Sequence, residues 1–284
     1  MPRQKRAIIT GVTSGLGLEV SKSLAKLGYD LVLVGRNEAK LREIAAELEA
    51  LSPNKATIDY FLCDFEQLDQ MAAVSKLIGK AYREIDVVIN NVGIWETKQR
   101  LNENGFDMTW TVNYFSPFVF THQLLPTLRL TAQETQDVRI VNLTSDAHRF
   151  GKITFPLEKQ PFHFFRTYGS TKLANLLHAK YLASLFAEEN IRVNAVHPGV
   201  VATEFWRTLP NPVIKTIKLL MISPEEGAKT VLSVAAAPNL TASGQYFERM
   251  KSVVPSELAR DTTLMNTLYR ETTVLLAEFL QTTT

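Results

Sequence analysis

Short apolar runs recur along the chain, and patterns typical of amphipathic helices separate them. The runs are expected to form strands at Ala7–Thr10, Leu31–Val34, Thr57–Leu62, Val87–Ile89, Val138–Leu143, Arg192–Val196 and Gln245–Phe247. Most of them do not alternate apolar and polar residues, which is typical of strands buried on both faces of a sheet. Because helices join them in right-handed crossovers, the pattern predicts a parallel sheet of about seven strands with helices on both faces.

The first expected helix follows Gly17 and ends at Gly28. The others are expected at Glu38–Leu51, Gln67–Ala81, Gly105–Leu130, Tyr168–Asn190, Pro224–Ala237 and Glu257–Leu280. Pro117 and Pro126 lie inside the helix expected at Gly105–Leu130 and could interrupt it, because proline has no backbone N–H. The sequence contains no linker, repeat or shift in composition. It therefore predicts a single-domain, doubly wound α/β fold over 1–284, with a cofactor half at about 1–145 and a substrate side at about 146–284.

Composition argues against several classes of partner. The 284 residues are 45% hydrophobic and 21% charged, and the net charge is +2 without a basic run. These values are ordinary for a globular protein, so we expect no nucleic acid or anionic membrane as a partner. No apolar stretch reaches the ~18 residues of a transmembrane segment. The basic start of the chain has too short an apolar run for a signal peptide, and we expect a cytoplasmic protein.

Cysteine and histidine usage gives no sign of a metal site. Cys63 is the only cysteine, which excludes an internal disulfide and a cysteine-based metal cluster. Its apolar surroundings in a predicted strand favour a small core residue over a reactive thiol. None of the five histidines has metal-ligand spacing, and no metal is expected. His197, at a strand end before Pro198, is interpreted as structural.

A glycine-rich turn joins the first predicted strand to the first predicted helix. Its sequence is Thr10-Gly11-Val12-Thr13-Ser14-Gly15-Leu16-Gly17. Gly11 allows the tight turn, whereas Gly15 and Gly17 let the backbone approach a pyrophosphate at the positive end of the helix. The alternative is a plain strand-to-helix connection, which the three glycines and two hydroxyl side chains disfavour.

Tyr168 and Lys172 lie four residues apart in one predicted helix. Their Cβ atoms are expected ~5–6 Å apart on the same face. A lysine cation at this distance favours the phenolate, so we expect Lys172 to lower the pKa of Tyr168 from its usual ~10. A phenol with such a pKa can exchange a proton with a reacting oxygen. The alternative is an exposed helix with a tyrosine on its apolar flank.

Several motifs follow one another in a characteristic order. After the glycine-rich turn come Asn90-Asn91-Val92-Gly93, Asn113, Ser145, Tyr168-x-x-x-Lys172 and Pro198-Gly199. As a set, they closely resemble the short-chain dehydrogenase/reductase family, and the resemblance covers residues 7 to at least 203. Val112-Asn113, Val141–Ser145 and His197–Thr203 are most similar to its retinol dehydrogenase-like branch. Val92 is a mild departure, because this family usually has alanine there.

The resemblance implies a Rossmann fold and assigns roles to individual residues. Tyr168 would be the catalytic acid/base, and Lys172 would lower its pKa and bind the nicotinamide ribose. Ser145 would hold the substrate oxygen, and Asn113 would hold a water that connects Lys172 to solvent. The cofactor-binding residues would be Gly11, Thr13, Ser14, Gly15, Leu16, Gly17, Arg36, Asp64, Phe65, Asn91, Val92, Gly93, Tyr168, Lys172, Pro198, Gly199, Val201 and Thr203.

The choice of cofactor depends on the residue that follows the second strand. Arg36 stands where a carboxylate would bind a ribose 2′-hydroxyl and repel a phosphate. Because an arginine can pair with a 2′-phosphate, we expect NADP(H). The alternative is a solvated arginine without a role. Asp64, at the end of the third strand, is expected to accept a hydrogen bond from the adenine amino group.

These features predict an NADP(H)-dependent oxidoreductase that interconverts a carbonyl and an alcohol. The aromatic and aliphatic residues of 147–167 and 200–221 suggest a small, apolar substrate. We expect Trp95, Phe205 and Trp206 to line the substrate pocket and Val200–Met221 to form a mobile lid. Two other functions stay open, namely a catalytically silent NADP(H)-binding sensor and a sugar-nucleotide epimerase or dehydratase. The sequence does not determine the oligomeric state, and a homo-oligomer is one of the open possibilities.

Overall fold

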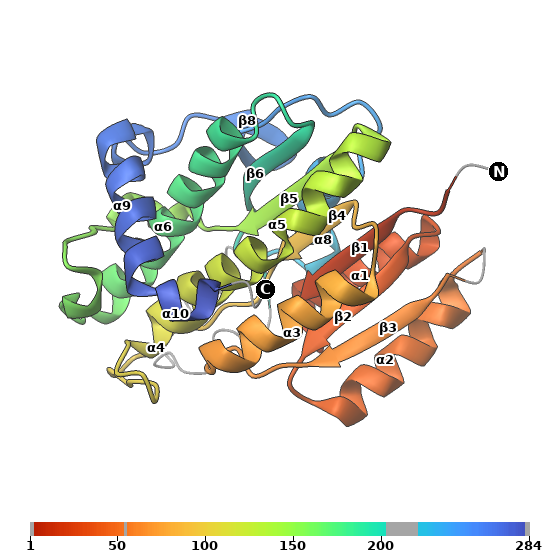
Figure 1. The fold of residues 1–284 in the computed structure, drawn as a ribbon, viewed down its shortest axis with the longest axis horizontal. Helices are drawn as coiled ribbons and strands as arrows, with labels where there is room; N and C mark the ends of the chain where they lie inside the picture. The colour runs from red at the N-terminus through yellow and green to blue at the C-terminus, as the bar shows by residue number, and fades with distance from the viewer. Residues whose placement is uncertain (1–2, 54–55, 203–220, 282–284) are drawn as a thin grey trace.

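An eight-stranded sheet forms the centre of the computed structural model, which describes residues 3–53, 56–202 and 221–281 (Figure 1). Its strand order is β3-β2-β1-β4-β5-β6-β7-β8. Strands β1 to β7 pair in parallel, and β8 is antiparallel to β7. The strands are β1 (Arg6–Thr10), β2 (Asp30–Gly35), β3 (Ile58–Leu62), β4 (Val87–Asn90), β5 (Val138–Leu143), β6 (Ile191–His197), β7 (Tyr246–Glu248) and β8 (Lys251–Val253).

Helices cover both faces of this sheet, and each face has its own hydrophobic core. In β1, Ile8 belongs to one core, whereas its neighbours Ala7 and Ile9 belong to the other, as the alternation of a strand requires. Residues of α3 (Leu68–Ala81), α5 (Ser116–Thr135) and α6 (Phe164–Leu185) complete the first core. Residues of α1 (Gly15–Lys26), α2 (Glu38–Leu51) and α8 (Pro224–Ala235) complete the second.

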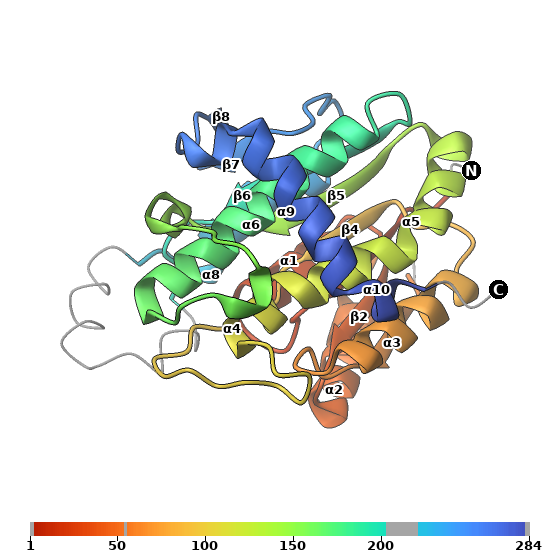
Figure 2. The ribbon, with the colours of Figure 1, turned by 60° about the vertical axis from the view of Figure 1, so that its left-hand side comes forward.

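Other elements connect the layers or lie outside them. Figure 2 shows α9 (Thr262–Leu275) crossing the outer side of α6, and α10 (Ala277–Leu280) follows it and packs against α3 and α5. A short helix, α4 (Met108–Trp110), continues through a π-helical turn, η1 (Thr111–Phe115), directly into α5. The remaining elements are the 3₁₀ turns η2 (Asp146–Phe150), η3 (Leu157–Lys159) and η5 (Leu258–Arg260).

The structure confirms the predicted doubly wound α/β fold and corrects several details. The sequence did not predict β8. The helix that carries Tyr168 begins at Phe164 and ends at Leu185, so Tyr168 lies in its second turn rather than at its start. The predicted helix over 105–130 is divided into α4, η1 and α5, and it extends to Thr135. Most of the predicted lid at 200–221 lies outside the described residues.

The buried environment of Cys63 agrees with its interpretation as a core residue. Its side chain is buried in the first core, and burial, helped by the nearby charge of Asp64, raises the pKa of the thiol to about 12. Within the described ranges, no helix is both long and apolar enough to cross a membrane. The same ranges contain no cluster of three or more side chains able to hold a metal ion.

Candidate active site

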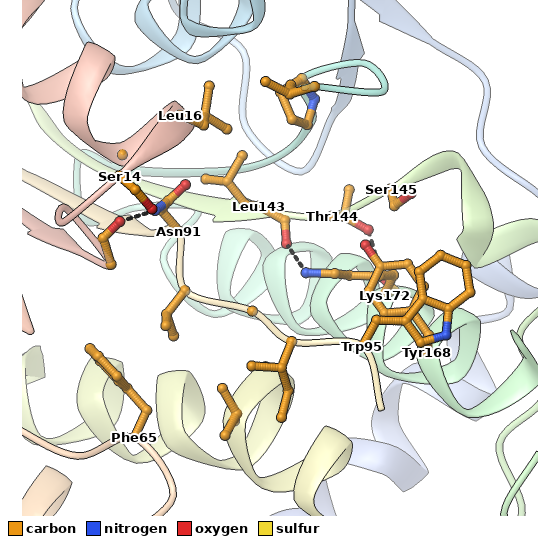
Figure 3. A pocket seen from close by; sticks show the side chains of 18 of the residues that line it. Ser14, Leu16, Phe65, Asn91, Trp95, Leu143, Thr144, Ser145, Tyr168 and Lys172 are labelled. Atoms are coloured by element: carbon orange, nitrogen blue, oxygen red, sulfur yellow. Dashed lines mark hydrogen bonds between the residues drawn. The ribbon is translucent and has the colours of Figure 1, made fainter. Parts of the chain in front are cut away.

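A cavity of about 370 Å³ lies at the carboxyl ends of the parallel strands, the edge of such a sheet where ligands bind (Figure 3). The loops after β1, β2, β3, β4, β5 and β6 all contribute to its wall. Predicted site residues that line it are Gly11, Thr13, Ser14, Leu16, Gly17, Arg36, Asp64, Phe65, Asn91, Val92, Gly93, Trp95, Ser145, Tyr168, Lys172, Pro198, Gly199 and Val201. The fold thus brings together residues that lie up to 190 positions apart, from Gly11 to Val201.

The glycine-rich turn forms one end of this cavity. Gly11 and Gly15 have φ angles of 70° and 57°, in the left-handed region that side chains other than glycine rarely adopt. A Cβ on Gly17 would lie 2.2 Å from the carbonyl oxygen of Gly11, so the turn can close only around glycine. The side chain of Asn91 donates to the carbonyl oxygens of Thr10 (2.9 Å) and Gly11 (3.0 Å) and fixes the turn from the next strand.

This turn leads directly into the N-terminus of α1, which begins at Gly15 and provides unpaired backbone N–H groups and a positive dipole end. The side chain of Ser14, at the cap position, makes no capping hydrogen bond. An anionic pyrophosphate fits such a helix end, and Gly11, Ser14 and Gly17 line the cavity there. The residues present therefore fit a dinucleotide at this end of the cavity.

Tyr168 and Lys172 lie at the other end, and both side chains are buried. The Lys172 Nζ lies 5.6 Å from the centre of the Tyr168 ring and donates to the carbonyl oxygen of Leu143 at 3.2 Å. The hydroxyl of Thr144 donates to the main-chain carbonyl oxygen of Lys172 (2.7 Å) and attaches α6 to the end of β5. The spacing that predicted one shared face is thus confirmed.

The expected direction of the tyrosine pKa is wrong for this structure. Burial raises the pKa of Tyr168 above its ordinary value, and the hydrogen bond with Ser145 offsets only part of this effect. Burial also lowers the pKa of Lys172 to about 8. The physical reason is that removing a group from water disfavours its charged form, and both groups lose their hydration here.

Ser145 and Asn113 support the pair from two sides. Ser145 follows β5, and its hydroxyl lies at the cavity near Tyr168 while accepting from the backbone N–H of Ala147 at 3.2 Å. Asn113 does not line the cavity. Its side chain instead accepts from the N–H of Ile94 (2.7 Å) and donates to the carbonyl oxygen of Ile94 (2.9 Å). Asn113 therefore fixes the loop that follows β4.

Trp95 covers the ring of Tyr168. The two rings are nearly parallel (Figure 3). Their centroids lie 4.6 Å apart, and the angle between their planes is 9°. The indole N–H of Trp95 donates to the carbonyl oxygen of Phe164 at 2.9 Å, which attaches the β4 loop to the first turn of α6. This places a flat apolar wall beside the phenol of Tyr168.

The part of the cavity wall formed by the loops after β2 and β3 carries charged side chains. Arg36 is 60% exposed, and its guanidinium lies 3.7 Å from a carboxylate oxygen of Glu66. Asp64 accepts from the backbone N–H of Glu66 at 3.1 Å, so this loop has a defined conformation. Arg36 and Asp64, which the sequence predicted to bind the cofactor, line this wall together with Glu66, to which the sequence gave no role.

Other residues of the wall were also missed. His197 was interpreted as structural, yet it lines the cavity, and its buried Nδ1 has no hydrogen-bond partner among the described residues. Its place at the end of β6, directly before Pro198, was the available signal. The further unpredicted lining residues are Gly35, Glu66, Ile94, Glu96, Val112, Leu143, Thr144 and Val200. Three predicted residues, Thr203, Phe205 and Trp206, lie outside the described residues.

Comparisons with known proteins show the family to which the chain belongs. A family model described as short chain dehydrogenase matches residues 5–212. Short-chain dehydrogenase TIC 32 A, chloroplastic, from Brassica napus is 32% identical over 93% of this chain and 86% of its own length. Retinol dehydrogenase 13 of Homo sapiens is 30% identical, covering 94% of this chain and 83% of its own length.

Solved structures of the same fold are also found. L-sorbose reductase from Gluconobacter frateurii, in complex with NADPH and L-sorbose, superposes with a TM-score of 0.69 at 22% identity. The match covers 86% of this chain and 94% of the reductase. At this level of identity the likeness concerns the fold alone.

Proposed function

Since the chain belongs to the short-chain dehydrogenase family and is similar to its retinol dehydrogenase-like branch, we propose that it is an NADP(H)-dependent oxidoreductase. Its reaction interconverts a carbonyl and an alcohol. The observation that carries this proposal is the meeting of Ser145, Tyr168 and Lys172 at one end of the cavity whose other end is the glycine-rich turn. A dinucleotide that spanned this cavity would have its reactive end beside Tyr168.

The buried pair supports proton transfer in both directions. Because burial raises the pKa of Tyr168, its phenol stays protonated at neutral pH and can deliver a proton to the oxygen of a reduced carbonyl. In the oxidation direction Tyr168 acts as the base, and the ammonium of Lys172, still largely charged at pH 7 with a pKa of about 8, stabilises the phenolate. The Ser145 hydroxyl holds the substrate oxygen beside Tyr168.

NADP(H), when bound, supplies or accepts the hydride. The chain holds it through the α1 N-terminus, the glycine-rich turn and the loops after β4 and β6. Arg36 and Asp64 both line the cavity. If the adenosine of the cofactor lies near Asp64, its 2′-phosphate would lie near Arg36, whose positive charge favours NADP(H) over NAD(H). Lys172 would bind the nicotinamide ribose, and Asn113 would act by fixing the loop of Gly93, where a Cβ would lie 3.3 Å from the Lys172 Nζ.

The substrate side is proposed to be apolar. Trp95 presents its ring next to Tyr168, and the sequence adds Phe205 and Trp206 beyond the described residues. Apolar and aromatic walls with few polar groups are typical of small-molecule pockets. We therefore place a small, apolar carbonyl or alcohol compound at this end, with Trp95 as one wall.

The proposal is tested by following NADPH oxidation with a panel of aldehydes, ketones, quinones and retinoids. Wild-type protein is expected to turn over at least one apolar member. Tyr168→Phe keeps the ring on Trp95 and removes only the hydroxyl, so turnover should fall ~10²-fold or more while NADPH affinity stays nearly unchanged. Tight NADPH binding without turnover of any compound would favour the silent sensor instead. Turnover of the variant within a few fold of wild type would remove Tyr168 from the mechanism.

A further inference from the structure

Glu66 lies between two arginines at the far end of the cavity. Its carboxylate accepts two hydrogen bonds from the guanidinium of Arg100, each 3.2 Å long. The same carboxylate lies 3.7 Å from the Nη1 of Arg36. Glu66 and Arg36 both line the cavity, whereas Arg100 does not. A negative charge therefore stands beside the cation that the proposed function assigns to the 2′-phosphate.

Arg100 holds this carboxylate more firmly than Arg36 does. Two parallel N–H···O bonds from one guanidinium match the geometry of a carboxylate, whereas the 3.7 Å contact of Arg36 is an ion pair without a hydrogen bond. Arg100 is fixed on its other side by Glu96, which accepts from its Nη2 at 2.9 Å. The side chain of Glu66 is only 23% exposed, so its charge faces the protein more than bulk water.

We propose that Arg100 is a positioning residue for cofactor selection. By holding and neutralising Glu66, it leaves Arg36 available to the 2′-phosphate of NADPH. This inference rests on the proposed function, because it requires NADPH to be the preferred cofactor. It assigns selectivity to a residue outside the cavity, on the segment between β4 and α4, far in sequence from Arg36.

Removal of Arg100 has two consequences for the phosphate. Glu66 loses its stronger partner and can pair closely with Arg36, and its charge then opposes a 2′-phosphate without compensation. NADH has an uncharged 2′-hydroxyl at that position, so Glu66 has no phosphate there to repel. Loss of Arg100 should therefore weaken NADPH binding and leave NADH binding nearly unchanged, which a purely structural role for Arg100 would not do.

The experiment measures the affinities of NADPH and NADH by fluorescence titration of the purified protein, without turnover. Arg100→Gln is expected to lower the NADPH/NADH affinity ratio about 3- to 10-fold, the size of one partly screened charge interaction near a surface. Glu66→Gln should raise the ratio. Arg100→Gln made in the Glu66→Gln background should have a smaller further effect, because the carboxylate beside Arg36 is gone and only Glu96 then loses its partner. Arg100→Lys keeps the charge but cannot make both parallel hydrogen bonds to Glu66, so its affinity ratio should lie between those of wild type and Arg100→Gln.

Two controls separate this inference from the proposed function. Arg83→Gln removes another exposed arginine, paired with Glu134 at 2.9 Å outside the cavity wall, and should leave the ratio unchanged. Arg36→Asp should reverse the preference for NADPH. If wild type prefers NADPH and Arg36→Asp reverses this while Arg100→Gln changes nothing, only the role of Arg100 is overturned. If wild type prefers NADH and Arg36→Asp has no effect, both the NADPH assignment and this inference are overturned. Equal losses for both cofactors in Arg100→Gln would also overturn it, as a general structural effect.

Discussion

Lys172 is a cation in a place that disfavours cations. Its side chain is buried, and the hydrogen bond that its ammonium donates reaches a neutral acceptor, the carbonyl oxygen of Leu143. A buried charge with little compensation destabilises the folded state, and the lowered pKa of Lys172 expresses this effect. In the proposed function the same charge stabilises a phenolate at Tyr168. Stability and activity therefore place opposite demands on this residue.

Lys172→Met should make the empty protein more stable near neutral pH while abolishing most of its turnover. The substitution keeps a chain of similar length and removes the charge. The pKa of Lys172 is about 8 in the folded protein against an ordinary value of 10.5, so between these pH values the unfolded chain holds a proton that the folded chain has lost. The contribution of Lys172 to the free energy of unfolding therefore rises with pH across this window.

The measurement is the thermal midpoint of both proteins from pH 7 to 10.5. The advantage of Lys172→Met should be full at pH 7 and shrink toward pH 10.5, where Lys172 is neutral in the folded protein and half deprotonated in the unfolded chain. Lys40→Met, which removes an exposed lysine on α2, provides the control and should show no such trend. An advantage that is the same at every pH would contradict a role for the buried charge.

The sequence predicted which residues meet here but not their electrostatics. Four-residue spacing in a helix fixes the shared face of Tyr168 and Lys172, and the structure confirms it. Burial depends on what the rest of the chain packs over that face, such as the Trp95 ring 4.6 Å from the Tyr168 ring. A local pattern contains no such information, and the sign of the tyrosine pKa shift was therefore wrong. The same limit explains why the contacts among Arg36, Glu66 and Arg100 were not foreseen.

At the level of elements, hydrogen bonds of the π-helical turn η1 join the loop after β4 to α6. Its central residue, Asn113, uses its side chain to fix Ile94 and donates to the Thr171 hydroxyl at 3.1 Å. Its main-chain oxygen accepts from the side chain of Asn175 at 2.8 Å. Single π-helical turns inside α-helices are frequent at functional sites. Asn175 thus satisfies a buried carbonyl that the wider turn presents toward α6.

Asn175→Leu should destabilise the protein and also reduce turnover. The carbonyl oxygen of Asn113 would lose its side-chain partner while buried, which costs ~1–3 kcal/mol in the free energy of unfolding. Because Asn113 fixes the loop beside Lys172, turnover should fall beyond what the loss of stability explains. Gln123→Leu is a matched control, since the Gln123 side chain also donates from a helix to a buried carbonyl, that of Phe279, at 2.6 Å.

Denaturant unfolding and steady-state kinetics of the two variants separate these effects. Both should lose stability by similar amounts, but only Asn175→Leu should lose turnover under conditions where both are folded. Equal kinetics in the two variants would mean that the contact between Asn175 and Asn113 supports only the fold.

The elements that the sequence predicted best were the long apolar ones. Burial on both faces gives largely apolar runs, and such runs predicted β1, β2, β4 and β5. Strand β8 was missed because it has three residues, two of them exposed, Lys251 and Ser252, and no apolar run. Pro117 did not break the chain of helices, because it lies in the first turn of α5, where a missing N–H is tolerated. A sequence pattern alone could not show that the turn before it is π-helical.

At the level of the whole molecule, the sheet joins the two halves that the sequence distinguished. Strand β5, in the cofactor half, pairs with β6, on the substrate side, from Val138↔Ile191 to Leu143↔Val196. The first core also contains residues from both halves, including Val34 of β2 and Leu268 of α9. A shared sheet and a shared core favour unfolding as one unit.

We therefore predict a single cooperative unfolding transition that NADPH shifts to higher temperature. A ligand that binds only the folded state stabilises it by ~2.7 kcal/mol at 100 times its Kd. With an unfolding entropy of ~2.1 cal/mol/K per residue, this raises the midpoint of a chain of 284 residues by about 5 °C. At equal concentration NADH should give a smaller shift, because it offers no phosphate to Arg36. Differential scanning calorimetry checks both points, with Arg36→Asp as the control that should reverse the order of the two cofactors. Two separate transitions, only one of them shifted by NADPH, would instead show that the cofactor half and the substrate side unfold independently.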